Sequence, residues 1–185
     1  STTPVDLTRS LAERLERETG MTWLDAPVSG GPPAALSGRL AIMVGGAESV
    51  FEKASPILES LADSLVHMGP VGTGQVTKMV NQICTLNNFV ILAEALNLAE
   101  RGGVDTGELV AALGTGYAGS NLMKAMWPRM IARDFEPAGY LRQVLKDLDM
   151  VHDLAHDLKA ATPISTQSAE LFRIMAARGH EELDG

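Results

Sequence analysis

The sequence is poor in cysteine, in aromatic residues and in positive charge, and the first and last of these shortages each exclude a class of protein. Cys84 is the single cysteine among 185 residues, so an internal disulfide framework is excluded. Aromatic residues make up 4%, and acidic residues outnumber basic ones by 23 to 15. The resulting net charge of -8 repels phosphate backbones, and we therefore expect no nucleic-acid partner.

Long apolar runs are missing as well. No stretch reaches the ~18 consecutive apolar residues of a membrane-spanning helix, and no signal peptide is visible. We therefore expect a cytoplasmic protein without a membrane partner. Cys84 suits such a reducing compartment, and the apolar residues around it predict a buried structural thiol, not a nucleophile.

The first part of the chain predicts strands that alternate with helices. With 45% hydrophobic residues, the chain can bury one sizeable core or two small ones. A helix is expected over 47–62, interrupted where Ser55-Pro56 would start a new helix. This alternation indicates α/β architecture. The apolar runs that predict strands are 21–28, 40–44 and 64–68.

A further helix is predicted near the start of the chain. Leu7, Leu11 and Leu15 recur every four residues and form one helical stripe. Gly20 is placed to end this helix, because glycine adopts the left-handed conformation that closes a helix. The sequence opens directly on this helix, which we interpret as the start of a piece cut from a longer protein.

The second part of the chain predicts helices alone. One long helix is expected from about 75 to 101, ended by Gly102-Gly103. We therefore draw a boundary near residue 72, between an α/β part at 1–72 and an all-α domain at 73–185. The predicted apolar stripe of the long helix is Val76, Met79, Val80, Ile83, Leu86, Val90, Ala93 and Leu98. The further helices are expected near 105–114, 120–132, 138–159 and 164–178.

Ser29, Gly30 and Gly31 directly follow a predicted strand, in the segment Asp-Ala-Pro-Val-Ser-Gly-Gly at 25–31. Successive small residues let backbone N–H groups converge on an anion, and the serine adds a hydroxyl donor. A carboxylate is the natural guest of such a loop. A tight turn made of ordinary turn-forming residues is the structural alternative.

Lys78, Asn81 and Gln82 share one face of the long helix, because they are spaced i, i+3 and i+4. Their neighbours are apolar. The lysine either extends its ammonium group to solvent, or is partly desolvated and becomes a usable general base. The spacing alone leaves both alternatives open.

Two other charged segments have ordinary explanations. Lys146 and Asp147 fit the solvated face of an amphipathic helix. His152 and His156 are one helical turn apart, which can suit zinc, but no third ligand is evident. We therefore expect no metal site.

Taken together, several segments resemble the β-hydroxyacid dehydrogenase family, in particular its 3-hydroxyisobutyrate and tartronate semialdehyde dehydrogenases. That family also includes 6-phosphogluconate dehydrogenase. The resemblance runs from Ser1 to about Asp184, in the expected order. The segments are Asp-Ala-Pro-Val-Ser-Gly-Gly at 25–31, Gly-Arg-Leu-Ala-Ile-Met-Val-Gly-Gly at 38–46, Gly-Pro-Val-Gly-Thr-Gly-Gln-Val-Thr-Lys-Met-Val-Asn-Gln at 69–82, Glu-Ala-Leu-Asn-Leu-Ala-Glu-Arg-Gly at 94–102 and Lys-Asp-Leu at 146–148.

The resemblance implies a role for each of the candidate residues. It implies that the loop Ser29-Gly30-Gly31 holds the carboxylate of the substrate and that Lys78 is the catalytic lysine. The family's helper asparagine usually lies four residues after the lysine. Gln82 stands at that place here and Asn81 precedes it, so both residues are candidates.

The resemblance also implies NAD or NADP as cofactor. The family's Ser-Thr pair falls on Ser1 and Thr2, which makes Thr2 a nucleotide contact, and the lysine of Lys-Asp-Leu falls on Lys146 near the cofactor. The family's Gly-x-Gly-x-Met-Gly turn, which holds the pyrophosphate, does not occur in this sequence. We therefore expect the 185-residue chain by itself not to bind the cofactor tightly.

The fold expected from the resemblance is the C-terminal portion of a Rossmann-like NAD(P)-binding domain, followed by an all-α domain built on the long helix. The expected function is NAD(P)-dependent interconversion of a small β-hydroxy acid, of the 3-hydroxyisobutyrate or glycerate type, and its semialdehyde. The expected partners are this carboxylate substrate and copies of the chain in a homodimer or homotetramer. A non-catalytic helical assembly module and an imine-reductase-like relative are the alternatives.

Overall fold

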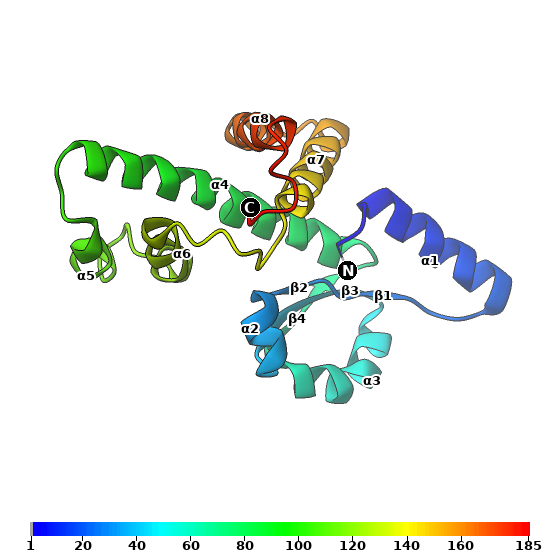
Figure 1. The fold of residues 1–185 in the computed structure, drawn as a ribbon. Helices are drawn as coiled ribbons and strands as arrows, with labels where there is room; N and C mark the ends of the chain where they lie inside the picture. Colours follow the sequence, from blue (N-terminus) through cyan, green and yellow to red (C-terminus); the bar gives the residue numbers. More distant parts are fainter. Residues whose placement is uncertain (1) are drawn as a thin grey trace. The chain divides into compact units, whose positions relative to one another are not determined.

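The computed structural model describes residues 2–185, so Ser1, the first residue of the predicted Ser1-Thr2 pair, lies outside the described residues. The chain forms two compact units (Figure 1). The first comprises Ser1–Asn81 and Asp153–Ala160, and the second comprises Gln82–His152 and Ala161–Gly185. Two helices contribute to both units, α4 (Thr73–Arg101) and α7 (Leu141–Leu158).

The first unit is built on a small mixed sheet with β3 (Leu40–Gly46) at its centre. One edge of β3 pairs in parallel with β4 (Ala62–Gly69). The other edge pairs antiparallel with two short strands, β1 (Leu24–Asp25) and β2 (Val28–Ser29). The predicted strand at 21–28 is therefore shorter and broken, because Pro27 has no N–H to donate to a ladder.

Helices α2 (Gly31–Leu36) and α3 (Glu48–Leu58) lie below the strands in Figure 1. Helix α3 contacts both β3 and β4, and a 3-10 turn at Glu59–Leu61 follows it. The predicted interruption at Pro56 was wrong, since α3 continues through it. Pro56 lies in the last turn of α3, where the missing N–H costs a single hydrogen bond.

Helix α1 (Val5–Thr19) ends at Gly20 with φ 71°, which confirms the predicted left-handed cap. Its buried residues are Val5, Thr8 and Ala12. The predicted leucine stripe does not form the buried face, because Leu7 and Leu11 are 44% and 39% exposed. The helix also contacts the segment just before α4, because Arg9 Nε donates to the carbonyl of Val71.

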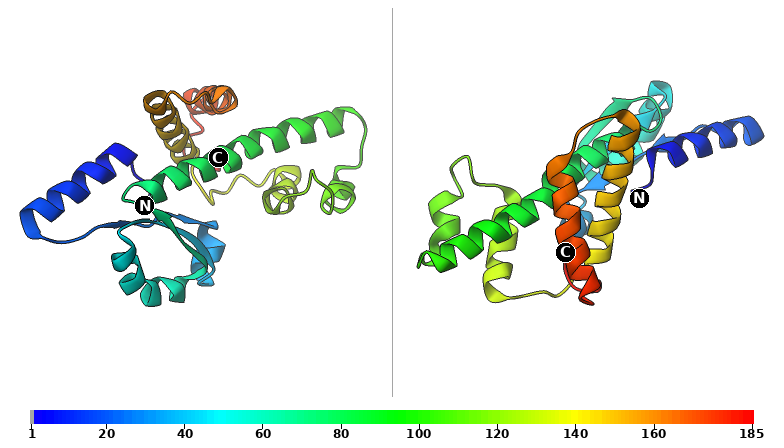
Figure 2. Two further views of the ribbon diagram at one scale, coloured as in Figure 1. Left: turned by 180° about the vertical axis from the view of Figure 1, so that it is seen from behind. Right: turned by 90° about the horizontal axis from the view of Figure 1, so that it is seen from above.

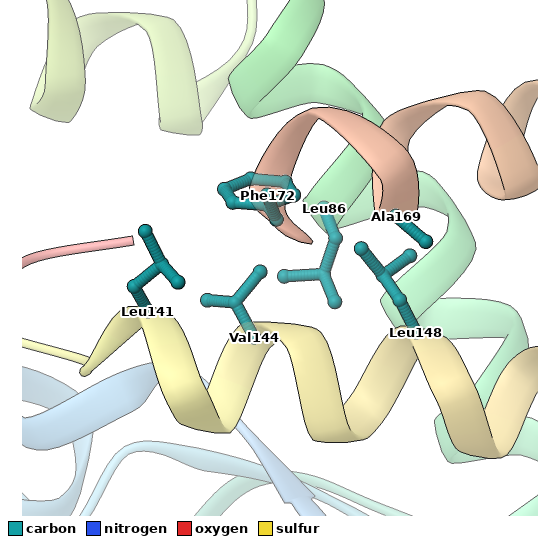
Figure 3. Close-up of a cluster of buried hydrophobic side chains, with 6 residues drawn as sticks. All are labelled: Leu86, Leu141, Val144, Leu148, Ala169 and Phe172. Carbon is teal, nitrogen blue, oxygen red and sulfur yellow. The ribbon is translucent and has the colours of Figure 1, made fainter. Parts of the chain in front are cut away.

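The second unit contains helices alone, apart from one isolated bridge between Tyr140 and Asp184. Figures 1 and 2 show α7 and α8 (Pro163–Ala177) side by side. Figure 3 shows their side chains meeting α4 in one apolar cluster, which consists of Leu86, Leu141, Val144, Leu148, Ala169 and Phe172. The unit also contains a 3-10 turn at Thr106–Glu108, α5 (Leu109–Leu113) and α6 (Asn121–Ala132).

A second cluster joins α6 to the far half of α4. Met123 and Trp127 are buried against Leu92 and Leu96, and Met126 and Met130 pack at its border. The Trp127 indole also donates a hydrogen bond of 3.0 Å to the carbonyl of Leu92. The small mixed sheet and the helical unit together confirm the predicted fold class, an α/β part followed by an all-α part. No helix within residues 2–185 has the length and apolar character needed to cross a membrane.

The buried face of α4 differs from the predicted apolar stripe. Gln75, Met79, Gln82 and Leu86 are buried along one line, so two amides stand where apolar side chains were expected. Val80 and Leu98, which the prediction placed in the stripe, are 55% and 73% exposed.

The predicted burial of Cys84 was wrong, since its side chain is exposed. Each residue advances an α-helix by about 100°, so a residue two positions after the buried Gln82 points to the opposite side. The apolar neighbours of Cys84 in sequence therefore say little about its own surroundings.

Candidate active site

The carboxylate of Asp25 holds the start of α4 against the sheet. Asp25 is 3% exposed, and its Oδ1 accepts a hydrogen bond of 2.7 Å from the backbone N–H of Gly72. Its Oδ2 accepts a second one, of 2.9 Å, from the N–H of Gln75. A helix leaves its first N–H groups without intrahelical acceptors, and the carboxylate supplies these acceptors.

The Ser29 loop is tied to the same helix at a second point. Ser29 Oγ donates a hydrogen bond of 3.0 Å to Asn81 Oδ1. Gly30 and Gly31 follow with φ values of 121° and 65°, which L side chains rarely adopt. A Cβ on Gly30 would lie 2.5 Å from Ala34 Cβ, so the loop requires glycine there on two grounds.

Lys78 lies between these two ties on α4. It follows Gln75 by three residues and precedes Asn81 by three, so all three are neighbours along one side of the helix. The side chain of Lys78 is half-buried, and so is that of Asn81. A cavity of 650 Å³ in the same unit is lined by Trp23, His67 and others, and neither Lys78 nor Ser29 is among its lining residues.

Gln82 belongs to a cluster of polar side chains within the second unit. It is 8% exposed, and its Nε2 donates a hydrogen bond of 2.5 Å to Asp147 Oδ2. The other carboxylate oxygen of Asp147 lies 2.9 Å from the ammonium of Lys146. The Lys146 side chain is 52% exposed and that of Asp147 is 13% exposed. The lysine thus lies at the surface, while the aspartate orients a buried amide.

Thr2 is half-buried, and the residue after it is anchored to α4. The backbone N–H of Thr3 donates a hydrogen bond of 3.2 Å to Gln75 Oε1. The segment that carries the predicted nucleotide contact is therefore fixed to the first turn of the helix that carries Lys78.

Sequence reasoning missed two residues of this arrangement, Asp25 and Asp147. Both lie in motifs that the sequence analysis singles out, but motif spacing does not reveal the partner of a carboxylate. A signal was present for Asp25, because a charged residue at the end of an apolar strand has to find hydrogen-bond donors when it is buried.

Family models match nearly the whole chain. Residues 72–185 match the model described as the NAD-binding part of NADP-dependent 3-hydroxyisobutyrate dehydrogenase. Residues 1–69 match the model of the NAD binding domain of 6-phosphogluconate dehydrogenase. Both models describe NAD-binding parts of dehydrogenases, so the predicted cofactor, NAD or NADP, is confirmed at this level.

Curated relatives carry names of the same kind. The chain is 38% identical to the 2-hydroxy-3-oxopropionate reductase of Escherichia coli, over 100% of this chain and 62% of the relative. It is 32% identical to the mitochondrial 3-hydroxyisobutyrate dehydrogenase of Bos taurus, over 96% of this chain and 55% of the relative.

Solved structures show the same fold. A crystal structure of 3-hydroxyisobutyrate dehydrogenase from Salmonella typhimurium matches with a TM-score of 0.91 at 25% identity. That match covers 100% of this chain and 65% of the other. A 3-hydroxyisobutyrate dehydrogenase from Mycobacterium tuberculosis, solved with L-serine, matches with a TM-score of 0.87 at 31% identity, over 100% of this chain and 65% of the other. The chain thus spans less than two thirds of the length of these relatives.

Proposed function

This chain belongs to the β-hydroxyacid dehydrogenase family, and on that premise we propose that the full-length protein interconverts a small β-hydroxy acid and its semialdehyde with NAD or NADP. The substrate we propose is of the 3-hydroxyisobutyrate or glycerate type. The observation that carries the proposal is the hydrogen bond between Ser29 and Asn81. It holds an anion-binding loop against the helix of Lys78, one turn from that lysine.

Lys78 acts as the general acid and base in this proposal. A half-buried amine can take the proton of the substrate hydroxyl during oxidation and return it during reduction. NAD(P), when bound, accepts or supplies the hydride. The lysine therefore has to lie within hydrogen-bond reach of the substrate oxygen. Its place on a rigid helix favours such a fixed position.

The Ser29 loop binds the substrate carboxylate. The Ser29 hydroxyl donates to Asn81 Oδ1 in the structure, and in this proposal it turns its hydrogen to the carboxylate when the substrate binds. Gly30 and Gly31 have no side chain, so their backbone can approach the anion closely. Before the substrate binds, Asn81 holds this loop through its side-chain oxygen. Asn81 and Gln82 both remain candidates for orienting the reacting oxygen, since they follow Lys78 by three and four residues on α4.

We propose Thr2 and Lys146 as the cofactor contacts within this chain. The residues fit a dinucleotide, because the side chain of Lys146 is exposed and its ammonium group is held by the carboxylate of Asp147. A cation held in this way can meet the polar groups of a dinucleotide. We also propose that residues 1–72 contribute to nucleotide binding, and that 73–185 form the domain for substrate binding and subunit association.

The two alternatives from the sequence are not favoured. Relatives that match 96% or more of this chain are named as a reductase and a dehydrogenase, which does not favour a non-catalytic assembly module. Imine reductases match with TM-scores of 0.54 to 0.58 at 16% to 19% identity, a likeness that concerns the fold alone.

Replacing the lysine tests the proposed function. We expect Lys78→Ala in the full-length protein to lower kcat by about 10²–10⁴-fold, the usual contribution of a general base, with the fold intact by circular dichroism. Oxidation of 3-hydroxyisobutyrate and of glycerate would be measured with NAD and with NADP. Lys53→Ala is the matched control, because Lys53 is an exposed lysine on α3. Activity of Lys78→Ala within roughly threefold of the parent, far below that range, would contradict the proposal.

A further inference from the structure

We propose that Asp25 is a positioning residue, which sets the distance between Lys78 and the Ser29 loop. The inference rests on the proposed function and adds a residue to it. Asp25 does not touch the substrate in this account. It acts through the helix that carries Lys78.

The carboxylate of Asp25 is engaged at both of its oxygens. Both oxygens of Asp25 accept backbone N–H groups at the start of α4, from Gly72 at 2.7 Å and from Gln75 at 2.9 Å. Two bonds from one planar group fix the orientation of a helix as well as its position. A helix that needed only a cap could use a serine or an asparagine from its own chain segment. Here the cap comes from a strand 47 residues earlier.

Backbone segments approach one another closely around this carboxylate. A Cβ on Gly74 would lie 2.6 Å from the carbonyl oxygen of Met43 and 2.7 Å from that of Asp25. A Cβ on Gly45 would lie 2.5 Å from Asp25 Oδ1. The first turn of α4 is thus pressed against β1 and β3 with no side chain between them. Such packing leaves the helix little freedom to shift along the sheet.

Lys78 lies between two hydrogen-bonded contacts that one short segment makes with α4. Asp25 is the last residue of β1 and Ser29 the last residue of β2, so the two are separated by only three residues. The first holds the N–H of Gln75, and the second holds the side chain of Asn81. Lys78 lies midway, three residues from each. This segment therefore holds α4 on both sides of the turn that carries the lysine.

The expected consequence is an effect on the chemical step. The Ser29 loop also belongs to the sheet through the pairing of Ser29 with Ala41, which does not involve Asp25. Loss of the Asp25 bonds should therefore leave carboxylate binding largely intact and displace Lys78. A misplacement of about 1 Å at a reacting group can cost about 10²-fold in rate.

The experiment uses the full-length protein and two variants that loosen the same contact. Asp25→Asn keeps the shape of the side chain but puts an NH2 group against one of the two N–H donors. Gly74→Ala keeps the carboxylate and pushes the helix away from β3. Ser120→Ala is the matched control, because Ser120 caps α6 through the N–H of Met123, and neither Asp25 nor the first turn of α4 takes part in that hydrogen bond.

The measurements are kcat, KM for the β-hydroxy acid, and the primary deuterium isotope effect on kcat. We expect Asp25→Asn and Gly74→Ala to lower kcat by about tenfold or more, with KM changed by less than about threefold, as displacement of a reacting group predicts. The isotope effect should rise toward its full value as hydride and proton transfer become limiting. Ser120→Ala should lower thermal stability and leave kcat and the isotope effect unchanged.

The opposite results are distinguishable. Parent-like kcat and isotope effect in folded Asp25→Asn or Gly74→Ala protein would overturn the inference. A fall of kcat in Ser120→Ala equal to that in Asp25→Asn would also overturn it, since loss of stability alone would then suffice. Failure of both Asp25→Asn and Gly74→Ala to fold would assign the contact to stability and overturn the inference as well. If Lys78→Ala is active, the proposed function fails first, whatever the Asp25 variants do.

Discussion

At the scale of single residues, Ser29 tests the carboxylate-binding loop. We expect Ser29→Ala in the full-length protein to raise KM for the β-hydroxy acid more than it lowers kcat. Loss of one hydrogen bond to a charged group should cost about 1.5–3 kcal/mol of binding free energy. Steady-state kinetics with the acid as variable substrate measures this cost. An unchanged KM with a lower melting temperature would favour the tight-turn alternative for the loop.

The Gln82–Asp147 hydrogen bond leads to a second prediction at this scale. Gln82→Leu leaves the largely buried Asp147 carboxylate without its amide donor, so we expect unfolding free energy to fall by about 1–3 kcal/mol. Urea unfolding of the single variants and of Gln82→Leu with Asp147→Leu would measure the coupling. A double variant whose loss equals the sum of the single losses would show that the two side chains do not interact.

Motifs in the sequence identified the candidate residues, but not what each one contacts. The Ser29 loop and Asn81 were predicted separately, and the structure joins them by a hydrogen bond. Asp25 and Asp147 escaped prediction because their partners, Gly72 and Gln82, are 47 and 65 residues distant. Cys84 was misjudged because its neighbours along the chain are not its neighbours around the helix.

At the scale of elements, periodicity predicted the helices better than it predicted their buried faces. Helix α4 begins and ends within two residues of its predicted bounds, and glycines follow it as expected. Its buried line nevertheless includes Gln75 and Gln82, because polar side chains can be buried when they find partners. A pattern based on hydrophobicity alone cannot find such positions. Pro56 likewise was tolerated, since one lost hydrogen bond at a helix end is a small cost.

The contact between α6 and the C-terminal segment gives a prediction at the element scale. Arg129, on α6, donates to the carboxylates of Asp134 at 3.0 Å and Asp184 at 2.8 Å. Asp184 also accepts the N–H groups of Ala138 and Gly139. We expect Arg129→Met to lower unfolding free energy by about 1–3 kcal/mol, since charged hydrogen bonds are lost. Chemical denaturation would measure it, with the exposed Arg133→Met as control. Equal stability of the two variants would contradict this role of Arg129.

The hydrogen bond between Arg129 and Asp134 also predicts a dependence of stability on pH. The hydrogen bond from Arg129 holds the pKa of Asp134 below its ordinary value of 3.8, and the N–H of Glu136 lowers the pKa further. A carboxyl with a lowered folded pKa stabilises the fold above its unfolded pKa, and the stabilisation is lost as pH falls through the folded value. We therefore expect stability to decline below about pH 4 and to decline less in Asp134→Asn. Identical acid unfolding curves for the two proteins would contradict the prediction.

At the scale of the whole molecule, the order of elements was predictable and the interactions between copies were not. Strands that alternate with helices, followed by a long helix and further helices, indicated an α/β part and a helical part, and the order of elements agrees. Exposed apolar residues on the surface could not be predicted from the pattern, because exposure depends on what packs against each element. Within the described residues, Leu7 and Leu11 on α1 and Val66 and Met68 on β4 are such positions.

These surfaces lead to a prediction for the 185-residue chain by itself: it forms oligomers and binds NAD(P) weakly. In the helical unit, Ile164, Leu171 and Ile174 of α8 are 63%, 40% and 50% exposed. Their spacing places them on one face of the helix, and an exposed apolar face of this kind favours association. The cofactor contacts that we propose in this chain are Thr2 and Lys146. Two contacts are too few to offset the loss of freedom of a bound dinucleotide, which costs several kcal/mol.

Light scattering and calorimetric titration of the isolated chain would test both parts of this prediction. We expect a scattering mass that is a multiple of 19.6 kDa, and no heat of binding with either cofactor at micromolar concentrations. Replacing Leu171 and Ile174 on α8 by serine should lower the scattering mass if the helical unit carries the contact, because both side chains are exposed on that helix. Serine at Leu7 and Leu11 of α1 provides the matched comparison on the first unit. A monomer that binds NAD or NADP at micromolar concentration would show that the residues of this chain hold the cofactor without further anchors, and that its exposed apolar positions do not associate.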